Sequence, residues 1–337
     1  MAILIVKLSA LGDVVQTLPS LRLIQEYLPN EDIFWVVEEA YKDLLYGHPQ
    51  IGRLFTPPKD YLKSPRELFK LFKEIRSERF DLVIDYQGLL KSGVICRMTR
   101  AKYKVGFSNH REGSPLFYTH RLSPYDPELH AVLRYLKLTR SALKLIGVSI
   151  PQEFNDFRDI PRDIILPEEK VSALSIPYFV LVPSARWKTK EWLPKNWEDL
   201  IEKLLIRFPQ QAIYLVGSGD HKVWAEEVSK KFPRVFTLFD KLSLRELVYV
   251  IRNSEVVITV DTGPMHIASA LDKPIVALFG PTAQNRTGPW SSIYRVVNAD
   301  LPCRPCFKRT CKDTLCIKKK LTPEMVLNAL EEMGILT

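Results

Sequence analysis

The stretch Val257-Ile258-Thr259-Val260-Asp261-Thr262-Gly263-Pro264-Met265-His266 predicts a strand, a tight turn and the start of a helix. Its β-branched residues predict a buried strand, which ends abruptly at Asp261. A helix is expected next, because Asp261 or Thr262 can cap it and Pro264 suits its first turn. Strand, tight turn and helix start leave backbone N–H groups and the positive end of the helix dipole as an anion site. His266 lies in that first turn, close to any bound anion.

The same alternation of short buried strands and amphipathic helices runs through the whole chain. The expected strands are 3–8, 33–37, 54–55, 82–84, 103–107, 178–182, 212–216, 235–238, 256–260 and 275–279. The expected helices are 14–28, 66–79, 89–98, 130–145, 196–208, 222–232, 243–253 and 322–333. Such an alternation is typical of α/β proteins with parallel, doubly wound sheets.

Length and composition predict two domains. The 337 residues exceed one ordinary domain, and 46% hydrophobic residues can supply a core to each of two. Periodicity fades between Gly147 and Tyr178, so the domain boundary is expected there. Two facing doubly wound domains would hold ligands at the carboxyl ends of their strands. The candidate residues at such ends are Asp13, Asp85, Gly217–Asp220 and Asp261–His266.

The net charge of +9 is concentrated in particular segments. Between Lys91 and Arg111 there are six basic residues and no acidic one, which favours an anionic partner. The segment 59–79 has seven basic and four acidic residues, and solvated surface explains it equally well. Charge alone leaves nucleic acid, anionic lipid and a phosphorylated small molecule open. No apolar run is long enough to span a bilayer and the start resembles a buried strand, so a cytoplasmic protein is predicted.

Four of the five cysteines crowd into one segment, at Cys303, Cys306, Cys311 and Cys316. Their spacing matches zinc ribbons poorly, and disulfides are unusual in the cytosol. Zinc, disulfides and reduced thiols all stay open, and the segment is predicted to be structural. Cys96 stands alone in an apolar context and is expected to be a buried small residue.

Two loops carry candidate catalytic groups. Asp13 can cap a helix, or it can act as a general base that takes a proton from a hydroxyl. The loop 183–192 holds three cations and two tryptophans, which suit a diphosphate. Each of Arg186, Lys188 and Lys190 could supply the charge that contacts the diphosphate, and their spacing does not indicate which one does. The chain has neither a G-x-G-x-x-G nor a Walker pattern, which disfavours a dehydrogenase or a P-loop NTPase.

Six motifs are spread in order over nearly the whole chain. They are Leu4-Ile5-Val6-Lys7-x-Ser9-x-x-Gly12-Asp13-Val14-x-x-Thr17-Leu18-Pro19, Trp35-Val36-Val37-Glu38-Glu39, Ile84-Asp85-x-Gln87-Gly88-Leu89-x-Lys91-Ser92, Lys190-x-Trp192, Val260-Asp261-Thr262-Gly263-x-x-His266 and Phe279-Gly280-Pro281-Thr282. Together they resemble the ADP-heptose:lipopolysaccharide heptosyltransferases of glycosyltransferase family nine. The second and third motifs are most similar to heptosyltransferase I, which adds the first heptose to the Kdo of the inner core.

The resemblance implies a GT-B fold of two facing Rossmann-like domains. Residues 1–160 would bind the acceptor, 161–320 would bind the ADP-sugar, and 321–337 would form a helix crossing back onto the first domain. It implies inverting transfer of heptose from ADP-L-glycero-D-manno-heptose to a Kdo hydroxyl, without metal or cofactor. The partners would be this donor and the anionic Kdo-lipid A acceptor, with no nucleic acid and no transmembrane segment. The enzyme would work at the inner face of the cytoplasmic membrane.

The resemblance also implies roles for individual residues. Asp13 would be the general base. Lys190 and the N–H groups of Thr262 and Gly263 would stabilise the charge on the departing ADP. The further donor contacts would be Ser184, Arg186, Lys188, Asp220, Leu242, Asp261 and His266. The acceptor contacts would be Lys59, Lys63, Lys91 and Arg111.

The chain departs from the family pattern at two donor positions. The family has an acidic residue for the ribose just after Gly217, where this chain has His221-Lys222, and Asp220 is the expected substitute. Family threonines of the phosphate loop correspond here to Ala185 and Arg186, so a charge would replace hydroxyl contacts.

Three other functions remain open. A heptosyltransferase II-like enzyme would use a heptosyl-Kdo acceptor, and the cysteine segment resembles a feature of such relatives. A basic nucleic-acid-binding protein would use 91–111, although that stretch lacks interleaved aromatic residues. A nucleotide-sugar epimerase has a related sheet, but the G-x-G-x-x-G near residue 8 is missing.

Overall fold

The computed structural model describes residues 1–172, 174 and 177–335. The chain divides into two compact units, Met1–Pro167 and Glu168–Thr337. Positions 173, 175 and 176 of the expected boundary region, and 336 and 337 of the expected last segment, lie outside the described residues. No helix in the described part of the chain is long and apolar enough to cross a membrane.

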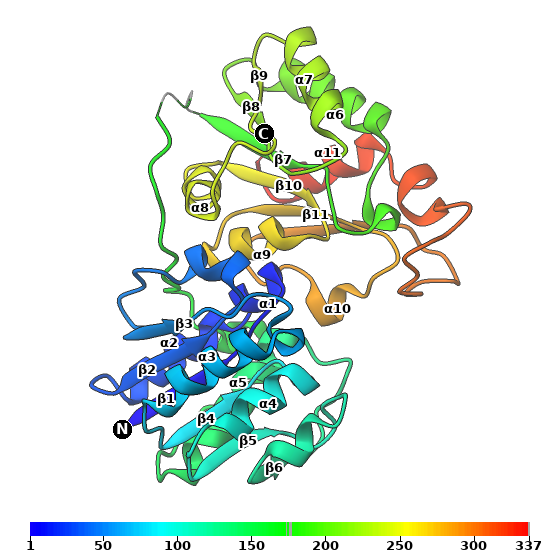
Figure 1. The fold of residues 1–337 in the computed structure, drawn as a ribbon. Helices are drawn as coiled ribbons and strands as arrows, with labels where there is room; N and C mark the ends of the chain where they lie inside the picture. The colour runs from blue at the N-terminus through cyan, green and yellow to red at the C-terminus, as the bar shows by residue number, and fades with distance from the viewer. Residues whose placement is uncertain (173, 175–176, 336–337) are drawn as a thin grey trace. The chain divides into compact units, whose positions relative to one another are not determined.

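Each unit contains a six-stranded parallel sheet (Figure 1). In the first unit the order is β3-β2-β1-β4-β5-β6, and in the second it is β12-β11-β10-β7-β8-β9. Both sheets thus have the doubly wound order 3-2-1-4-5-6, which confirms the predicted fold class. The strands are β1 Ala2–Val6, β2 Asp32–Val36, β3 Arg53–Phe55, β4 Leu82–Asp85, β5 Tyr103–Phe107, β6 His120–Leu122, β7 Tyr178–Val182, β8 Ala212–Leu215, β9 Val235–Thr237, β10 Val256–Val260, β11 Ile275–Phe279 and β12 Tyr294–Asn298.

Helices cover both faces of each sheet. In the first unit they are α1 Leu11–Val15, α2 Leu18–Tyr27, α3 Pro65–Arg76, α4 Leu90–Met98 and α5 Ala131–Leu145. In the second unit they are α6 Pro194–Arg207, α7 Lys222–Lys231, α8 Leu244–Arg252, α9 Gly263–Ala270, α10 Gln284–Thr287 and α11 Pro323–Glu332. Short 3₁₀ turns are η1 Glu39–Leu44, η2 Tyr61–Lys63, η3 Ser114–Phe117, η4 Phe157–Asp159 and η5 Lys188–Lys190, and η6 Leu315–Lys319 is a turn of π-helix.

Three differences from the expected elements have local causes. The single helix expected over 14–28 is two helices, α1 and α2, and Pro19 lies in the first turn of α2. The edge strand β6 was not expected, because three residues are too few to show a period. The edge strand β12 was also missed, and only one of its five residues is buried.

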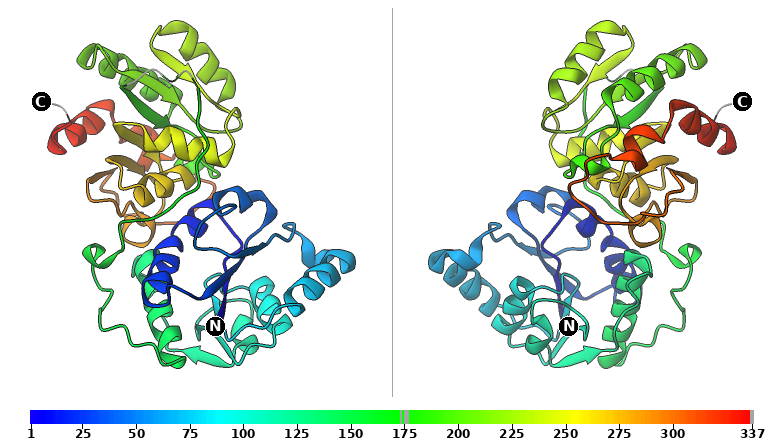
Figure 2. Two further views of the ribbon diagram at one scale, coloured as in Figure 1. Left: turned by 90° about the vertical axis from the view of Figure 1, so that its left-hand side faces the viewer. Right: turned by 90° about the vertical axis from the view of Figure 1, so that its right-hand side faces the viewer.

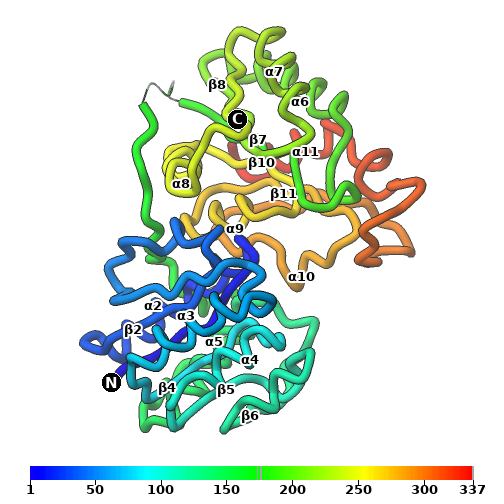
Figure 3. Tube along the Cα trace, viewed as in Figure 1, coloured from blue at the N-terminus to red at the C-terminus, as the bar shows by residue number. Residues whose placement is uncertain are grey.

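The expected C-terminal helix is present as α11. Helix α11 packs against α6, β11 and β12 (Figure 3). Its apolar residues Val326, Leu327 and Leu330 are buried in the core of the second unit. This face of α11 completes the core of the second unit.

The sheet order places one switch point in each unit. In the first unit it lies between β1 and β4, which pair in parallel from Ile3↔Leu82 to Val6↔Asp85. In the second it lies between β7 and β10, which pair from Val256↔Phe179 to Thr259↔Val182. Loops leaving neighbouring strands in opposite directions open a crevice there, and open α/β sheets bind ligands at that point. The carboxyl ends of these four strands carry most of the candidate residues.

Candidate active site

Asp13 lies in α1, directly after the switch-point strand β1. Its Oδ2 accepts a hydrogen bond from the backbone N–H of Ala10 at 3.0 Å, so one oxygen steadies the start of the helix. Its carbonyl accepts from the Thr17 hydroxyl at 2.9 Å. The side chain is nevertheless 44% exposed. Asp13 therefore serves the helix start with Oδ2 and leaves Oδ1 available to a ligand.

Lys7 is the buried neighbour of Asp13. Its ammonium lies 4.0 Å from Asp13 Oδ1, and it donates to the Tyr135 hydroxyl at 2.8 Å. It also donates to the carbonyl of Tyr86 at 3.0 Å. Burial by itself would lower the pKa of Lys7, but Tyr135 and the nearby carboxylates outweigh burial and raise it above its ordinary value. Lys7 is consequently a fixed positive charge behind Asp13.

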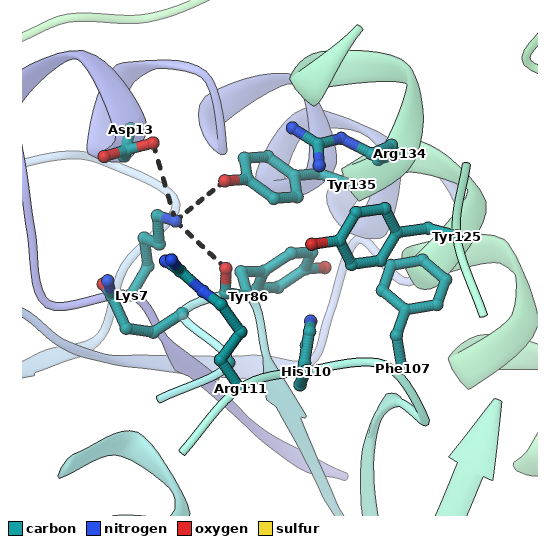
Figure 4. Close-up of a pocket in the computed structure, with 11 residues that line it drawn as sticks. Lys7, Asp13, Tyr86, Phe107, His110, Arg111, Tyr125, Arg134 and Tyr135 are labelled. Atoms are coloured by element: carbon teal, nitrogen blue, oxygen red, sulfur yellow. Dashed lines mark hydrogen bonds and ion pairs between the residues drawn. The ribbon is translucent and has the colours of Figure 1, made fainter. Parts of the chain in front are cut away.

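A pocket of about 180 Å³ opens beside this pair, entirely within the first unit (Figure 4). Three cations line it: Lys7, Arg111 and Arg134. The guanidinium of Arg134 stacks over the Tyr125 ring at 4.7 Å. With one carboxylate at its edge and three cations around it, the pocket is suited to a small anion that carries hydroxyl groups.

The loop after β4 holds the Asp13 turn in place. Gln87 Oε1 accepts from the backbone N–H groups of Leu8 and Ser9, at 3.1 and 3.0 Å. Gln87 is itself placed by Asp85, whose Oδ1 accepts from the N–H groups of Gln87 and Gly88 at 2.8 and 3.0 Å. Asp85 is fully buried and also accepts from two hydroxyls through Oδ2. Asp85 is thus a structural residue of this loop, and a ligand cannot reach it.

His110 forms the wall of the pocket behind Gly88. Gly88 has φ +65°, and a Cβ there would come within 2.5 Å of the His110 ring, so glycine is required. Burial lowers the pKa of His110 to about 4, against an opposing effect of Asp85. The ring therefore faces the pocket uncharged at neutral pH.

The four predicted acceptor residues lie in different settings. Arg111 is exposed on the pocket and its N–H donates to the Gly88 carbonyl at 2.9 Å. Lys91 is bound inside the unit, where its ammonium donates to Glu38 at 2.5 Å and to the Ser9 hydroxyl at 3.0 Å. Lys91 thus joins the end of β2 to the Asp13 turn. The exposed Lys59 and Lys63 lie around η2, and Lys63 pairs with Asp60.

In the second unit, Asp261 brings three sequence motifs together. Its carboxylate is 6% exposed and lies 2.7 Å from the Lys190 ammonium. The same oxygen accepts from the Thr282 hydroxyl at 2.6 Å. Lys190 is 17% exposed and its ammonium also lies over the Trp187 ring, at 4.7 Å. Asp261 therefore positions Lys190 and does not cap the following helix.

The start of α9 has no side-chain cap. Thr262 occupies the N-cap position in extended conformation, and its side chain makes no capping hydrogen bond. The backbone N–H of Gly263 is the first of the helix, followed by Pro264, which has none. His266 is buried in the first turn. This uncapped helix start next to Lys190 fits the anion site that the sequence predicts.

A second set of donor candidates surrounds the loop after β8. The Ser184 hydroxyl accepts from the Ser218 N–H at 3.3 Å, and a Cβ on Gly217 would come within 2.4 Å of that hydroxyl. Asp220 is 78% exposed and pairs with Lys188 at 2.7 Å. Arg186 is exposed and Leu242 is half-buried just before α8.

Glu191 joins this loop to the Lys190 loop. Its Oε1 accepts from the Ala185 N–H at 3.2 Å, and its Oε2 lies 3.2 Å from both Lys188 Nζ and His221 Nε2. Burial would raise the pKa of Glu191, but His221, the Ala185 N–H and Lys188 together lower it below its ordinary value. The glutamate thus stays charged and ties the candidate phosphate and ribose loops into one body.

The cysteine segment supports the Lys190 loop from outside. The Thr189 hydroxyl donates to the Lys308 carbonyl at 2.9 Å, and Arg304 donates to the Gly280 carbonyl at 2.5 Å. Arg309 stacks over the same Trp187 ring that Lys190 touches. All five cysteines are free thiols, and among the described residues no group of His, Cys, Asp or Glu is placed to hold a metal ion. Through these contacts the segment packs against the Lys190 loop.

Sequence reasoning missed several pocket residues. Lys7 interrupts an apolar strand, and that interruption was the available signal, because a lysine in a buried strand needs a partner. Arg134 and Tyr135 gave no such sequence signal, because both lie on α5, whose amphipathic pattern is explained by packing in the core. Gln87 was noticed only as part of a motif, without its function as a clamp on the Leu8 and Ser9 N–H groups.

Comparison with known proteins points to one family. Residues 68–316 match glycosyltransferase family 9 (heptosyltransferase). Lipopolysaccharide heptosyltransferase 1 of Pseudomonas aeruginosa is 30% identical over 364 aligned positions, which cover 99% of this chain and 98% of the relative. The structure of the E. coli heptosyltransferase WaaC with ADP has 27% sequence identity and a TM-score of 0.81, over 99% of this chain and 100% of that one. The same enzyme with ADP-2-deoxy-2-fluoro heptose has 27% identity and a TM-score of 0.78, over 98% and 99%. The chain belongs to glycosyltransferase family 9, the heptosyltransferases.

Proposed function

We propose that this glycosyltransferase moves a heptose from ADP-L-glycero-D-manno-heptose to a Kdo hydroxyl of the lipopolysaccharide inner core, with inversion. The observation that carries the proposal is the pocket of the first unit, where the partly exposed Asp13 stands beside three cations. A Kdo residue carries both a carboxylate and hydroxyl groups, so it matches both features. The names of the relatives favour an ADP-heptose donor and a lipopolysaccharide acceptor.

On the acceptor side, Asp13 acts as the general base. Its Oδ1 takes the proton of the attacking acceptor hydroxyl. At the same time the hydroxyl oxygen forms the new bond to the anomeric carbon of the heptose. Arg111 and Arg134 hold the acceptor carboxylate, which fixes the hydroxyl towards Asp13. Lys7 and the Ala10 N–H keep the Asp13 carboxylate in one orientation.

On the donor side, Lys190 stabilises the leaving group. The bond between the anomeric carbon and the phosphate oxygen breaks, and its electron pair leaves with ADP. Lys190 and the N–H groups at the start of α9 then compensate the added negative charge. Asp261 and Trp187 hold the ammonium, so little reorganisation is needed when the charge develops. Ser184, Asp220 and Leu242 would contact the rest of the nucleotide.

We assign the type I acceptor, Kdo on lipid A, at the inner face of the cytoplasmic membrane. Lys91 and Glu38, from the two motifs most similar to heptosyltransferase I, pair beside the Asp13 turn. Each motif therefore has a physical function at the acceptor site. A heptosyl-Kdo acceptor is the alternative, and it would need the same base.

A transfer assay read by mass spectrometry tests the proposal. ADP-heptose, UDP-sugars and GDP-sugars are each paired with Kdo-lipid A and with heptosyl-Kdo acceptors. The expected result is one added heptose on Kdo-lipid A, from ADP-heptose alone. Transfer only to heptosyl-Kdo would replace the type I assignment by type II, and no product from any ADP-sugar would overturn the proposal.

A further inference from the structure

Helix α3 has two faces of different character. Leu68, Leu71 and Ile75 face inward and pack in the core of the first unit. The outward face carries Arg66, Phe69, Lys70 and Lys73, at the spacing i, i+3, i+4 and i+7. Since the core already uses the inward face, nothing in the packing of the unit requires a phenylalanine on the outward one.

The apolar groups on this side are unusually exposed. Phe69 is 67% exposed, and Phe72 and Leu62 are 37% and 38% exposed. Leu62 lies in η2, the turn that leads into α3, so the three side chains belong to one continuous segment. Single exposed apolar residues are common on protein surfaces, whereas apolar groups gathered on one side of a surface helix are a feature of interaction sites.

Cations outnumber acids around these apolar groups. Helix α3 carries Arg66, Lys70, Lys73 and Arg76 against Glu67 and Glu74. Among the described residues Arg66, Lys70 and Lys73 make no close ion pair, whereas Asp60 and Glu78 pair with Lys63 and Arg53. The positive charge continues beyond the helix. Arg76 at its end and Arg97 of α4 both lower the pKa of the buried Lys104, after the larger effect of burial, so the two helix ends form one basic region.

We infer that the outward face of α3, with Leu62, Phe69, Phe72, Arg66, Lys70 and Lys73, docks onto an anionic lipid bilayer. Figure 2 shows α3, in light blue, at the outer edge of the first unit. The cations meet lipid phosphates, and the two phenyl rings enter the headgroup region. The choice of lipid over nucleic acid rests on the proposed function, because an acceptor anchored in lipid brings the enzyme to a membrane.

The test is flotation of the purified full chain with vesicles that contain no acceptor sugar. Vesicles of phosphatidylglycerol and phosphatidylethanolamine are expected to bind it, and phosphatidylcholine vesicles much less. Neutralising three cations, in Arg66→Gln/Lys70→Gln/Lys73→Gln, should weaken binding roughly 100-fold, at about fivefold per charge. Phe69→Ser/Phe72→Ser should weaken it roughly tenfold or more.

Matched controls come from the second unit. Lys195, Lys222 and Lys230 are exposed cations, and Ile206 is 74% exposed on α6. The triple glutamine variant of these lysines and Ile206→Ser should bind vesicles like the wild type. Equal losses in control and α3 variants, or no binding of the wild type to anionic vesicles, would overturn the inference. Tighter binding to single-stranded RNA through the same α3 residues would overturn it in favour of nucleic acid.

A second readout separates this inference from the proposed function. With a water-soluble, deacylated Kdo acceptor, the α3 variants should keep wild-type transfer, while transfer to Kdo-lipid A in vesicles falls. A chain that transfers no sugar at all but still floats through α3 would refute the proposed function and leave the membrane surface standing.

Discussion

The pairing of Lys190 with Asp261 predicts an unusual order of ADP affinities. Lys190→Met removes the cation expected to contact the diphosphate and leaves the buried Asp261 carboxylate unpaired. The ammonium of Lys190 lies 2.7 Å from the Asp261 carboxylate and would lie about 2.8 Å from a bound diphosphate oxygen. That oxygen is therefore within roughly 5.5 Å of Asp261. The remaining carboxylate therefore repels the ligand.

The size of this repulsion follows from Coulomb's law. At an effective dielectric constant of about 20, two unit charges roughly 5.5 Å apart repel by about 3 kcal/mol. Water that reaches the partly exposed Lys190 position reduces this to about 1–3 kcal/mol. Adding Asp261→Asn to Lys190→Met removes the repulsion. The double variant should therefore bind ADP roughly 5- to 100-fold more tightly than Lys190→Met alone.

Calorimetric titration with ADP, at neutral pH and about 150 mM salt, measures the affinity of four proteins: the wild type, Lys190→Met, Asp261→Asn and the double variant. Thr282→Val is the control, because it removes the hydroxyl that donates to Asp261 and changes no charge. It should cost only about 1 kcal/mol. If the double variant binds ADP as weakly as Lys190→Met, or the two substitutions add independently, Asp261 does not act through Lys190 and the reasoning fails.

Three more predictions concern the first unit. Asp13→Asn should keep ADP binding and the thermal melting temperature, while kcat falls at least 100-fold; wild-type turnover would exclude Asp13 as the base. Glu38→Gln should lower kcat/KM for the acceptor and leave the KM for ADP-heptose unchanged, because the Lys91 that it holds steadies the Asp13 turn through Ser9; an equal change in both constants would contradict this positioning role. Burial lowers the pKa of His48 to about 4, so the folded chain binds fewer protons than the unfolded chain between about pH 6.5 and 4. The free energy of unfolding should thus fall by up to about 3 kcal/mol as the pH drops through this window, and urea titrations of His48→Gln should show a shallower fall.

The architecture was predictable because both sheets are parallel and buried. Short, β-branched apolar runs such as Val256–Val260 are typical of central strands of parallel sheets, and turn residues mark their carboxyl ends. Sequence spacing also placed Asp13 and Asp261 correctly at such ends. The short edge strands β6 and β12 were not predictable, since few of their residues are buried and no period can form.

The chemistry at these strand ends was harder to predict than their position. A carboxylate at a strand end can cap a helix, fold a loop, hold a cation or face a ligand, and the choice depends on partners far away in sequence. Asp85 has its oxygens occupied by the loop and by Tyr118, and Asp261 by Lys190 and Thr282. Tyr118, Lys190 and Thr282 lie at least 21 residues from the aspartate that each contacts, and pairings over such separations leave no periodic signal.

Each unit contains an aspartate–lysine pair, but the more exposed residue is the aspartate in the first unit and the lysine in the second. Each has an aspartate after a switch-point strand and a lysine within 4.0 Å of it. In the first unit the lysine is 3% exposed and the aspartate 44%, whereas in the second the aspartate is 6% exposed and the lysine 17%. The buried member of each pair holds the other, and only the more exposed member can meet a substrate. The proposed glycosyl transfer needs a base for the acceptor and a cation for the leaving diphosphate, and the proposal gives these roles to the more exposed member of each pair, Asp13 and Lys190.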